Sequence, residues 1–449
     1  MHQWRCFLAM ATGLGAAPAC GDSLRPPALA PDHPGSPDAA PPLDAVTLTC
    51  DATWHDLQIG TARDDQLWGM TTDKHHNLYV SGFEDGVTGV TNIEPAGDSR
   101  GVVLQIDTSG AVRWQAVLDT SASDTIEDVK IDPETGTVYG VGRTSGAFEG
   151  FVNQGQFDTF VFSLDPTGQR TNLFQSGNER PQHPVRLSLD GSSIFVAGYD
   201  DVYVPFIAVV SDEDGFIGSF GRGGPELTQN FLHMVPTTAS NRLFDVAADP
   251  DDSGSIYIAS YVGGGLDSDV GAFVKRLNRD GTELWTRRVS ASTSDAVTAV
   301  GISPAGELFV TGATFQQLGA ARFGQQDAFV LKLDRATGAI LWATQAGSRD
   351  SDFPVALAFD DAGNIDIAGQ TEGAVAGINH GGVDVFAMKF GPDGTLLSSW
   401  QAGTAEHDLP TSIAVNCGRV LVGGFTRGAL VEGSTGTTGD DMFIIQAAL

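Results

Sequence analysis

Positive charge, methionine and cysteine are scarce in this sequence. The 449 residues include 25 Lys and Arg against 56 Asp and Glu, for a formal net charge of −31, with only 6 Met and 4 Cys. Because such a chain repels phosphate backbones and anionic lipid headgroups, nucleic-acid binding is not expected. The 56 glycines and the lack of long runs of Ala, Leu, Glu and Lys exclude a mainly helical chain and favour an all-β fold.

Residues 1–20 have the layout of a secretory signal. A basic residue, Arg5, precedes an apolar stretch at 7–17 that is too short to span a bilayer. The residues Ala-Pro-Ala-Cys that end at Cys20 resemble a bacterial lipobox, in which the cysteine carries the lipid. We therefore predict an exported outer-membrane or cell-surface lipoprotein that meets the membrane only through this anchor. Pro18 and the lack of a Leu three places before the cysteine depart from the usual pattern, so a periplasmic or plainly secreted protein is the alternative.

Residues 21–48 predict a disordered tether. They are rich in proline and hold almost no large apolar side chains, so they cannot bury a core. With Cys6 in the signal and Cys20 lipidated, Cys50 and Cys417 remain in an oxidising compartment and form a candidate disulfide. The alternative is two unrelated thiols.

The tryptophans indicate an internal repeat. Their separations are 60, 171, 57 and 58 residues, and 171 is three times 57. The tryptophans concerned are Trp54, Trp114, Trp285, Trp342 and Trp400. The span from residue 50 to the end holds seven such periods.

Each repeat predicts four short strands. In the clearest copy, at 294–347, alternating or β-branched segments separated by Gly and Asp give strands at 296–302, 307–311, 328–333 and 340–345. The last copy stops after three strands, but residues 52–58 align with the strand that carries Trp342. Four-stranded units bury both faces when they stack radially.

We therefore predict an all-β fold over residues 49–449: one seven-bladed β-propeller of four-stranded antiparallel blades, in which the N-terminal strand completes the last blade. Each tryptophan would pack against the next blade. A bridge between Cys50 and Cys417 would then lock the closure of the ring.

The repeat also resembles known families. The pattern of Ser-Asp, then AVGISPAGELFVTG, then DAFVLKLDRATG and Trp342 resembles the bacterial seven-bladed β-propeller repeat family of secreted proteins, over nearly the whole predicted propeller. This resemblance implies fold and export but hardly any activity. Asp334-Arg-Ala-Thr-Gly338 with Trp342 also resembles the repeat of quinoprotein dehydrogenases and envelope-assembly lipoproteins. Those enzymes imply a cofactor cleft with calcium-binding carboxylates, a set that cannot be assigned in this sequence.

Aspartates recur at equivalent places in the blades. One set precedes the first strands: Asp124, Asp295, Asp352 and Asp408. A second set precedes the third strands: Asp158, Asp327, Asp384 and Asp441. Both sets should lie on one rim, where they cap the local backbone; weak binding of a divalent cation such as calcium is the alternative. No other cofactor is expected, and the histidines show no paired metal-ligand spacing.

The same rim should carry long loops of variable sequence, where recognition usually resides on a repeat scaffold. We expect them at 84–100, 145–157, 315–326, 372–383 and 427–440. Five phenylalanines could contact a ligand there or tuck between the loops: Phe148, Phe151, Phe157, Phe315 and Phe323.

The leading functional hypothesis is a monomeric, non-enzymatic binding or scaffold protein that engages a protein or polysaccharide through these loops. No catalytic residue is assigned. An enzyme (a lyase, hydrolase or quinoprotein dehydrogenase) would need His, Arg and carboxylates on the innermost strands, where the sequence shows too few His and Arg. A third hypothesis is an envelope-assembly scaffold that binds a partner by strand addition at a blade edge.

Overall fold

The computed structural model describes residues 54–449, apart from the gaps 90–91, 97–98, 202–212, 223, 225, 236–239, 251–253, 264–269, 293, 435 and 437. The described residues belong to one compact unit. No helix long and apolar enough to cross a membrane occurs among the described residues. The predicted signal, the tether, the lipidation site Cys20 and the cysteine Cys50 lie outside them.

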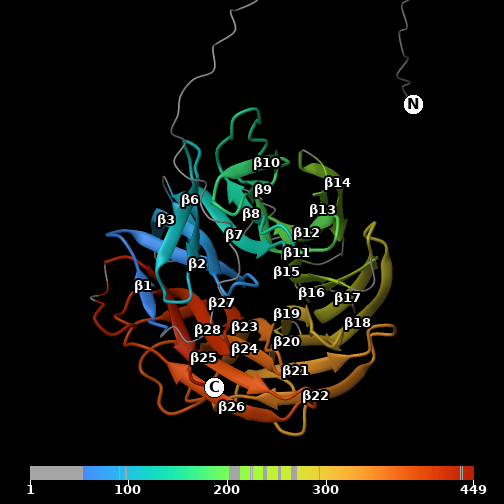
Figure 1. The fold of residues 1–449 in the computed structure, drawn as a ribbon. Coiled ribbons are helices and arrows are strands. Elements are labelled where there is room, and N and C mark those ends of the chain that lie inside the picture. Colours follow the sequence, from blue (N-terminus) through green and yellow to red (C-terminus); the bar gives the residue numbers. More distant parts are fainter. Residues whose placement is uncertain are drawn as a thin grey trace, which may run out of the picture. The chain divides into compact units, whose positions relative to one another are not determined.

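Seven antiparallel sheets stand around a central axis (Figure 1), as the repeat predicts. Blade 1 comprises β2 (Asp64–Thr72), β3 (Leu78–Gly89), β5 (Arg100–Ile106) and β6 (Val112–Leu118); blade 2 comprises β7 (Asp124–Ile131), β8 (Val138–Thr144), β9 (Asp158–Leu164) and β10 (Arg170–Ser176); blade 3 comprises β11 (Gln182–Leu189), β12 (Ser193–Asp200), β13 (Asp214–Gly221) and β14 (Thr228–Val235). Blade 4 comprises β15 (Ser240–Ala248), β16 (Ser255–Gly263), β17 (Gly271–Asn278) and β18 (Glu283–Ser290); blade 5 comprises β19 (Ala296–Ile302), β20 (Leu308–Thr314), β21 (Asp327–Leu333) and β22 (Ile340–Ala346). Blade 6 comprises β23 (Asp352–Phe359), β24 (Ile365–Thr371), β25 (Asp384–Phe390) and β26 (Leu396–Ala402); blade 7 comprises β27 (Asp408–Asn416), β28 (Arg419–Thr426), β29 (Asp441–Ala447) and β1 (Leu57–Ile59).

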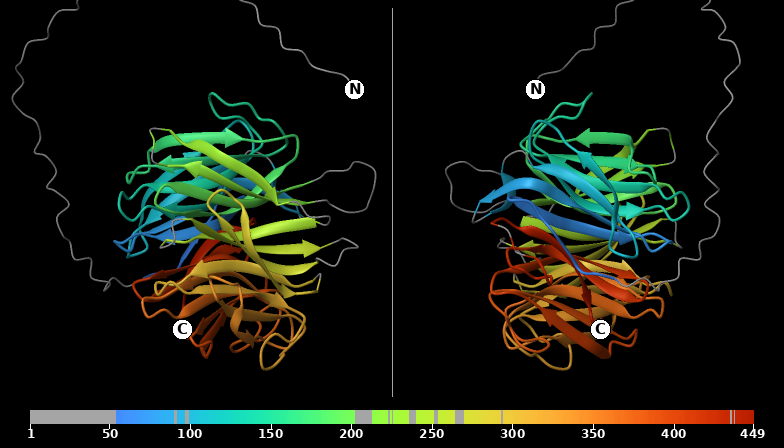
Figure 2. Two further views of the ribbon diagram at one scale, coloured as in Figure 1. Left: turned by 90° about the vertical axis from the view of Figure 1, so that its right-hand side faces the viewer. Right: turned by 60° about the vertical axis from the view of Figure 1, so that its left-hand side comes forward.

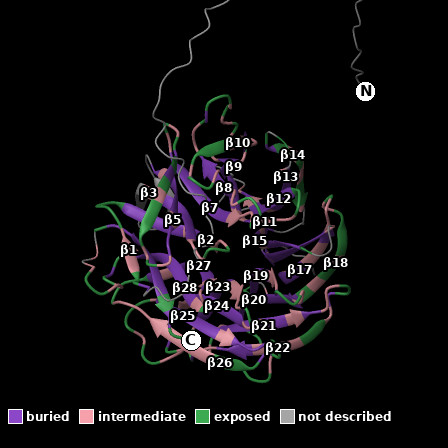
Figure 3. Cartoon of the chain, viewed as in Figure 1, coloured by how far each residue is buried: buried purple, intermediate pink, exposed green. Residues whose placement is uncertain are grey.

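The first strand of each blade lies innermost, and each packs against the first strands of both neighbouring blades, with β2 beside β27. Middle strands such as β8, β9 and β20 are buried along their whole length because neighbouring blades cover both faces. Fourth strands such as β22 and β26 begin with exposed residues (Figure 3). The core therefore consists of the layers between blades.

The ring closes between the two ends of the described chain. Strand β1 pairs antiparallel with β29, and Leu57, Gln58 and Ile59 face Ile444, Phe443 and Met442. Figure 2 shows blue β1 beside the red C-terminal strands. The pairing begins at residue 57, later than the expected 52–58, because Trp54 instead buries its side chain in an apolar cluster with Met442 and Ile444.

Tryptophans of the fourth strands pack on tight turns of the following blade. A Cβ placed on Gly168, Gly338 or Gly394 would lie within 3.0 Å of the ring of Trp114, Trp285 or Trp342, respectively. All three glycines have positive φ. The turn thus needs glycine both for its left-handed backbone and for the space that the indole occupies. The indole nitrogens of Trp114 and Trp285 also donate to Pro166 O and Arg335 O of those turns.

Trp400 departs from this arrangement. Trp342 pairs with Lys332, whereas the equivalent Lys389 pairs with Ser398, so Trp400 lies two residues further along its strand. It still packs against the apolar layer between blades 6 and 7. The physical reason is the closure: β29 and β1 come from opposite ends of the chain, so blade 7 has no turn on which a tryptophan at the usual position could pack.

One loop expected from the sequence contains regular structure. The segment 84–100 was expected to be a loop, but β3 continues to Gly89 and pairs with β4 (Asn92–Ala96) as a hairpin. The β-branched residues of this segment explain why its backbone extends.

Candidate functional site

The loops between second and third strands lie on one face of the propeller, which we call the loop face; it includes residues 145–157, 315–326, 372–383 and 427–440. At six of the seven blade junctions a backbone hydrogen bond joins the loop end to the first strand of the next blade. Across the junctions the donors and acceptors are Asp124 N to Ser99 O, Gln182 N to Phe157 O, Asn241 N to Glu213 O, Asp352 N to Gln326 O, Asp408 N to Val383 O and Asp65 N to Asp440 O. Loop ends and blade starts therefore share one rim, as expected.

A glutamine and an aspartate hold each well-defined loop in place. In blade 5, Gln345 Oε1 accepts hydrogen bonds from the backbone amides of Leu318 (2.9 Å) and Gly319 (3.2 Å). Its Nε2 donates to Gln316 O at 2.9 Å and to Asp327 Oδ2 at 2.8 Å. Asp327 also accepts from the amides of Phe323 and Gly324 at the other end of the loop. The two side chains thus fix both ends of the loop.

The same clamp recurs in three more blades. The pairs are Gln175 with Asp158, Gln401 with Asp384 and Gln58 with Asp441. Each glutamine oxygen accepts a loop amide, and each amide nitrogen donates to a loop carbonyl. The aspartates were predicted from the sequence, whereas the glutamines were not. The signal was present, because each glutamine stands two residues before a glycine.

The aspartates at the blade starts accept hydrogen bonds from the protein. Asp124 accepts from the amide and hydroxyl of Thr120, and Asp408 from those of Thr404. Asp295 and Asp352 accept from the hydroxyls of Thr314 and Thr371. Burial raises the pKa of Asp124 to about 6. Among the described residues no group of three or more His, Cys, Asp or Glu is arranged to hold a metal ion.

The five rim phenylalanines divide into two groups. Phe148 is buried edge-on against Phe160 at 4.9 Å, and Phe151 packs edge-on against Phe174. Phe157 lies under the guanidinium of Arg143. Phe315 and Phe323 are 38% and 50% exposed.

Other loop tips also present large apolar side chains. Val152 is 76% exposed and Ile378 is 66% exposed. Together with Phe323, they come from the loops of blades 2, 6 and 5. Loops whose ends are clamped therefore hold apolar side chains out to solvent on one face.

A cavity of about 660 Å³ occupies the central channel. Residues from all seven innermost strands line it, including Trp68, Glu127, His183, Arg242, Thr298, Phe353 and Pro410. His183, Phe353 and Pro410 lie in the first three residues of their strands, and these strands begin on the loop face. We call this end of the cavity the channel mouth.

One side of the channel mouth is a charged network, the polar arc, made of Glu127, Arg143, His183, Asp201, Arg242 and Glu213. Arg143 Nε lies 3.1 Å from Glu127 Oε1, and Arg143 Nη1 lies 2.6 Å from His183 Nδ1. His183 Nε2 lies 2.9 Å from Asp201 Oδ2. Arg242 donates from Nε and Nη2 to the two oxygens of Glu213.

Tyr199 joins the two halves of the polar arc. The His183 ring stacks on it at 4.9 Å and 13°, and the Arg242 guanidinium lies 4.7 Å from the centre of its ring. Burial raises the pKa of Tyr199 to about 12, so the phenol stays neutral. Burial alone would raise the pKa of Asp201, but the His183 hydrogen bond and the charges of Arg242 and Arg143 bring it below its usual value.

The expectation of too few His and Arg near the axis was wrong. Blades 2, 3 and 4 bring Arg143, His183, Arg186 and Arg242 to the channel. Three of these side chains stand on innermost strands and were overlooked: His183 and Arg186 on β11, and Arg242 on β15. Arg143 comes from the end of a second strand and reaches the channel mouth beside the first strand of the next blade.

The opposite side of the channel mouth is apolar. This apolar arc consists of Trp68, Phe353, Val355 and Pro410, from blades 1, 6 and 7. Trp68, Phe353 and Val355 are only half-buried. The channel mouth therefore has two unlike walls.

The polar arc is better suited to binding than to catalysis. Both ring nitrogens of His183 are engaged, so it is not available as a general base without rearrangement. The two lining threonines donate their hydroxyl hydrogens to backbone oxygens, Thr298 to Thr311 O and Thr411 to Leu67 O. A nucleophilic hydroxyl would instead need to donate to a general base.

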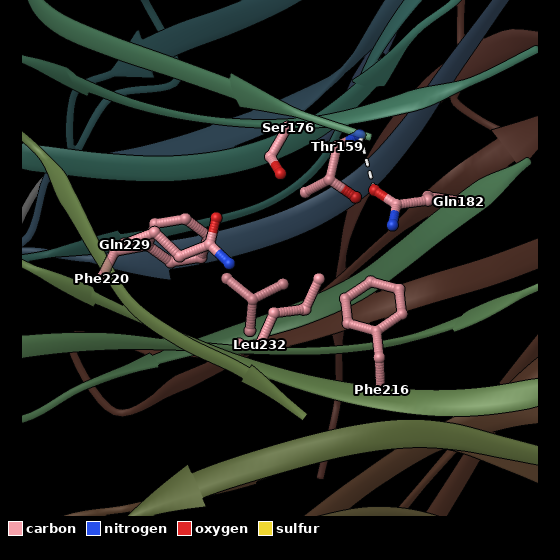
Figure 4. Close-up of a pocket in the computed structure, with 9 residues that line it drawn as sticks. Thr159, Ser176, Gln182, Phe216, Phe220, Gln229 and Leu232 are labelled. Carbon is pink, nitrogen blue, oxygen red and sulfur yellow. Dashed lines mark hydrogen bonds between the residues drawn. The ribbon is translucent and has the colours of Figure 1, made fainter. Parts of the chain in front are cut away.

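A second, enclosed cavity lies between blades 2 and 3 (Figure 4). Phe216, Phe220 and Leu232 line it beside Thr159 and Gln182, where Gln182 Oε1 accepts from the Thr159 amide at 3.3 Å. Its volume of about 10 Å³ is that of a single water-sized probe. It is therefore a packing void and too small for a ligand.

Cys417 occupies the turn between β27 and β28, as expected, with a positive φ of 52°. Its predicted partner Cys50 lies outside the described residues, four positions before Trp54. The pairing stays a prediction.

No family model matches this chain. An alignment over 110 residues shows 33% identity to the regulatory protein FlaEY of Caulobacter vibrioides; it covers 23% of this chain and 11% of that protein's length. Among solved structures, the chain is similar to a putative 6-phosphogluconolactonase from Bacteroides fragilis (12% identity, 77% and 85% of the two chains, TM-score 0.47) and to Sqt1 from Chaetomium thermophilum (13%, 86% and 87%, TM-score 0.44). What the structure itself establishes is a seven-bladed propeller of four-stranded antiparallel blades, closed by its N-terminal strand.

Proposed function

We propose that this chain is a non-enzymatic binding or scaffold propeller that engages a protein or polysaccharide through its loop face. The observation that carries the proposal is that loops held in place by the glutamine–aspartate clamps expose large apolar side chains to solvent. Val152, Phe323 and Ile378 stand in solvent on loops of three blades, at an energetic cost that a binding partner would remove.

Rigidity supports the same function. A loop that is already ordered loses little conformational entropy when it binds, so the clamps would raise affinity without adding contacts. The resemblance to secreted propeller repeats, the signal-like N-terminus and the Pro-rich tether favour an exported protein held at the cell envelope by lipid on Cys20.

The test uses the full chain and two triple variants, each of which replaces three exposed apolar side chains. Val152→Ser, Phe323→Ser and Ile378→Ser remove the loop-face side chains. Val112→Ser, Leu341→Ser and Leu397→Ser remove exposed side chains from outer strands instead. Binding to a glycan array and to isolated envelope proteins should fall at least tenfold in the first triple variant and stay within twofold in the second. Equal losses in both, or a loss only in the second, would refute the loop face as the binding surface.

The anchor is tested separately, by mass spectrometry of the protein purified from its membrane fraction. A diacylglycerol-type adduct on Cys20 is expected. A mature N-terminus elsewhere, without lipid, would remove the anchor and leave plain secretion.

Catalysis at the channel mouth is a second candidate, because His183, Arg143 and Asp201 are gathered there; it would require a substrate to replace one of the present partners of His183. A lyase or hydrolase acting there should lose turnover in His183→Gln while ligand binding persists. Binding with no turnover in the unaltered protein would leave the binding function alone.

A further inference from the structure

We infer that the channel mouth is a binding site for a neutral polyhydroxylated ligand, such as a sugar residue of a glycan. The inference rests on the proposed binding function and adds a second, chemically distinct site on the same face. It is carried by the size of the cavity, its two unlike walls and the balance of its charges.

The cavity has the size of a small-molecule site. Its volume of about 660 Å³ falls within the range of about 300–1,000 Å³ that is typical of such sites. It lies on the axis, where the seven innermost strands of a packed ring hold its walls. The site is therefore formed before any ligand arrives.

The charges of the polar arc are matched. Three guanidiniums, those of Arg143, Arg186 and Arg242, stand with three carboxylates around the channel mouth. Arg143 is paired with Glu127 and Arg242 with Glu213, while Asp201 lies 2.9 Å from His183 Nε2. Arg186 donates to Thr411 O across the channel at 2.8 Å. A charged ligand would lose its hydration shell on binding and would find no excess charge of opposite sign in the site. Its desolvation would therefore cost free energy that the site does not return. A neutral ligand avoids this cost.

The half-exposed members of the polar arc suit hydroxyl groups. The side chains of Asp201 and Arg242 are 35% and 40% exposed. A carboxylate accepts hydrogen bonds only, and a guanidinium donates them only, so together they match a hydroxyl group, which can do both. The stacking of His183, Tyr199 and Arg242 holds these groups in place.

The apolar arc suits the other side of a sugar ring. Pyranose rings present C–H groups on their faces and hydroxyls around their edges. Trp68 and Phe353 offer half-buried aromatic surface opposite the polar arc. A ligand with one polar edge and one apolar face can therefore satisfy both walls at once.

The experiment is titration calorimetry and saturation-transfer NMR on the full chain. The probes are glucose, galactose, mannose and N-acetylglucosamine, with glucuronate, glucosamine and inorganic phosphate as charged comparators. At least one neutral sugar should bind, and more tightly than each charged comparator. If no neutral sugar binds at about 10 mM, or if a charged comparator binds more tightly, the inference is wrong.

Variants locate the site. Asp201→Asn and Phe353→Leu should each weaken sugar binding at least tenfold, because one loses the carboxylate charge and the other the aromatic face. The matched controls Asp361→Asn, an exposed turn residue, and Leu397→Ala, on an outer strand, should stay within twofold. Thermal melting checks that each variant is folded, and Phe353→Met replaces Phe353→Leu if the latter is not.

The same variants separate this inference from the proposed function. If sugar binding falls in the loop-face triple variant but not in Asp201→Asn or Phe353→Leu, the channel mouth is not the sugar site while the loop face remains a binding surface. If the channel variants lose the sugar and the triple variant keeps its envelope ligand, the channel site stands and the loop face is not required.

Discussion

The clamp in blade 5 makes a quantitative prediction. Replacing Gln345 by Leu keeps the volume of this buried side chain but removes its four hydrogen bonds, two from loop amides, one to a loop carbonyl and one to Asp327. A net value of about 1 kcal/mol for each bond gives about 2–4 kcal/mol, since some of these groups will find water. This energy should appear as easier local opening of residues 315–326.

Hydrogen–deuterium exchange measures that opening directly. In Gln345→Leu the amides of Leu318 and Gly319 should exchange about 30- to 1,000-fold faster, the equivalent of about 2–4 kcal/mol. Strands β20 and β21 should keep their protection, because their ladder bonds are unchanged. Gln325→Leu is the matched control, since Gln325 is an exposed glutamine of the same loop that takes no part in the clamp. If the two variants exchange alike, the clamp does not hold the loop.

Three further predictions follow from the blades and their junctions. Gly168→Ala and Gly363→Ala impose the same left-handed strain, at φ of 84° and 79°, but only Gly168 faces an indole. In urea titrations Gly168→Ala should therefore lower the free energy of unfolding by about 1–3 kcal/mol more than Gly363→Ala does, and equal losses would exclude the Trp114 contact as a source of stability. Folded Asp124, with a pKa of about 6, holds its proton to higher pH than the unfolded carboxyl. The stability of the wild type relative to Asp124→Asn should therefore fall by about 2 kcal/mol as pH rises from about 4 to about 6, and a flat or rising difference would contradict it. Non-reducing peptide mapping should join Cys50 to Cys417, and alkylation of both thiols without prior reduction would reject the bridge.

Much of the fold was predictable because every repeat must meet the same packing and turn requirements. A strand that must be covered on both faces becomes continuously apolar, as in β20, and a turn between strands needs Gly and Asp at fixed places. The strands expected at 296–302, 328–333 and 340–345 therefore match β19, β21 and β22 to within a residue. Closure was predictable too, because the final repeat lacked a strand that the N-terminus could supply.

The candidate site was less predictable because its members share no repeat position. Arg143 is the last but one residue of a second strand, His183 is the second residue of a first strand, and Asp201 follows another second strand. Their proximity depends on the angle between blades 2 and 3, which a linear pattern does not contain. Trp400 shows the converse error, since its spacing matched the repeat while its position in the strand did not.

Blade 3 is the weakest copy of the repeat, and this departure has a physical explanation. Its first strand begins with Gln182 instead of Asp, and position 228, where the tryptophan is expected, is a threonine. Yet the same blade contributes His183, Arg186, Tyr199 and Asp201 to the channel mouth. Residues that serve only packing converge on one consensus, because every blade meets the same neighbours. If the channel mouth binds a ligand as we propose, a blade whose inner edge holds charged side chains around the cavity cannot keep that consensus on its first strand, and the loss there marks the binding side of the ring.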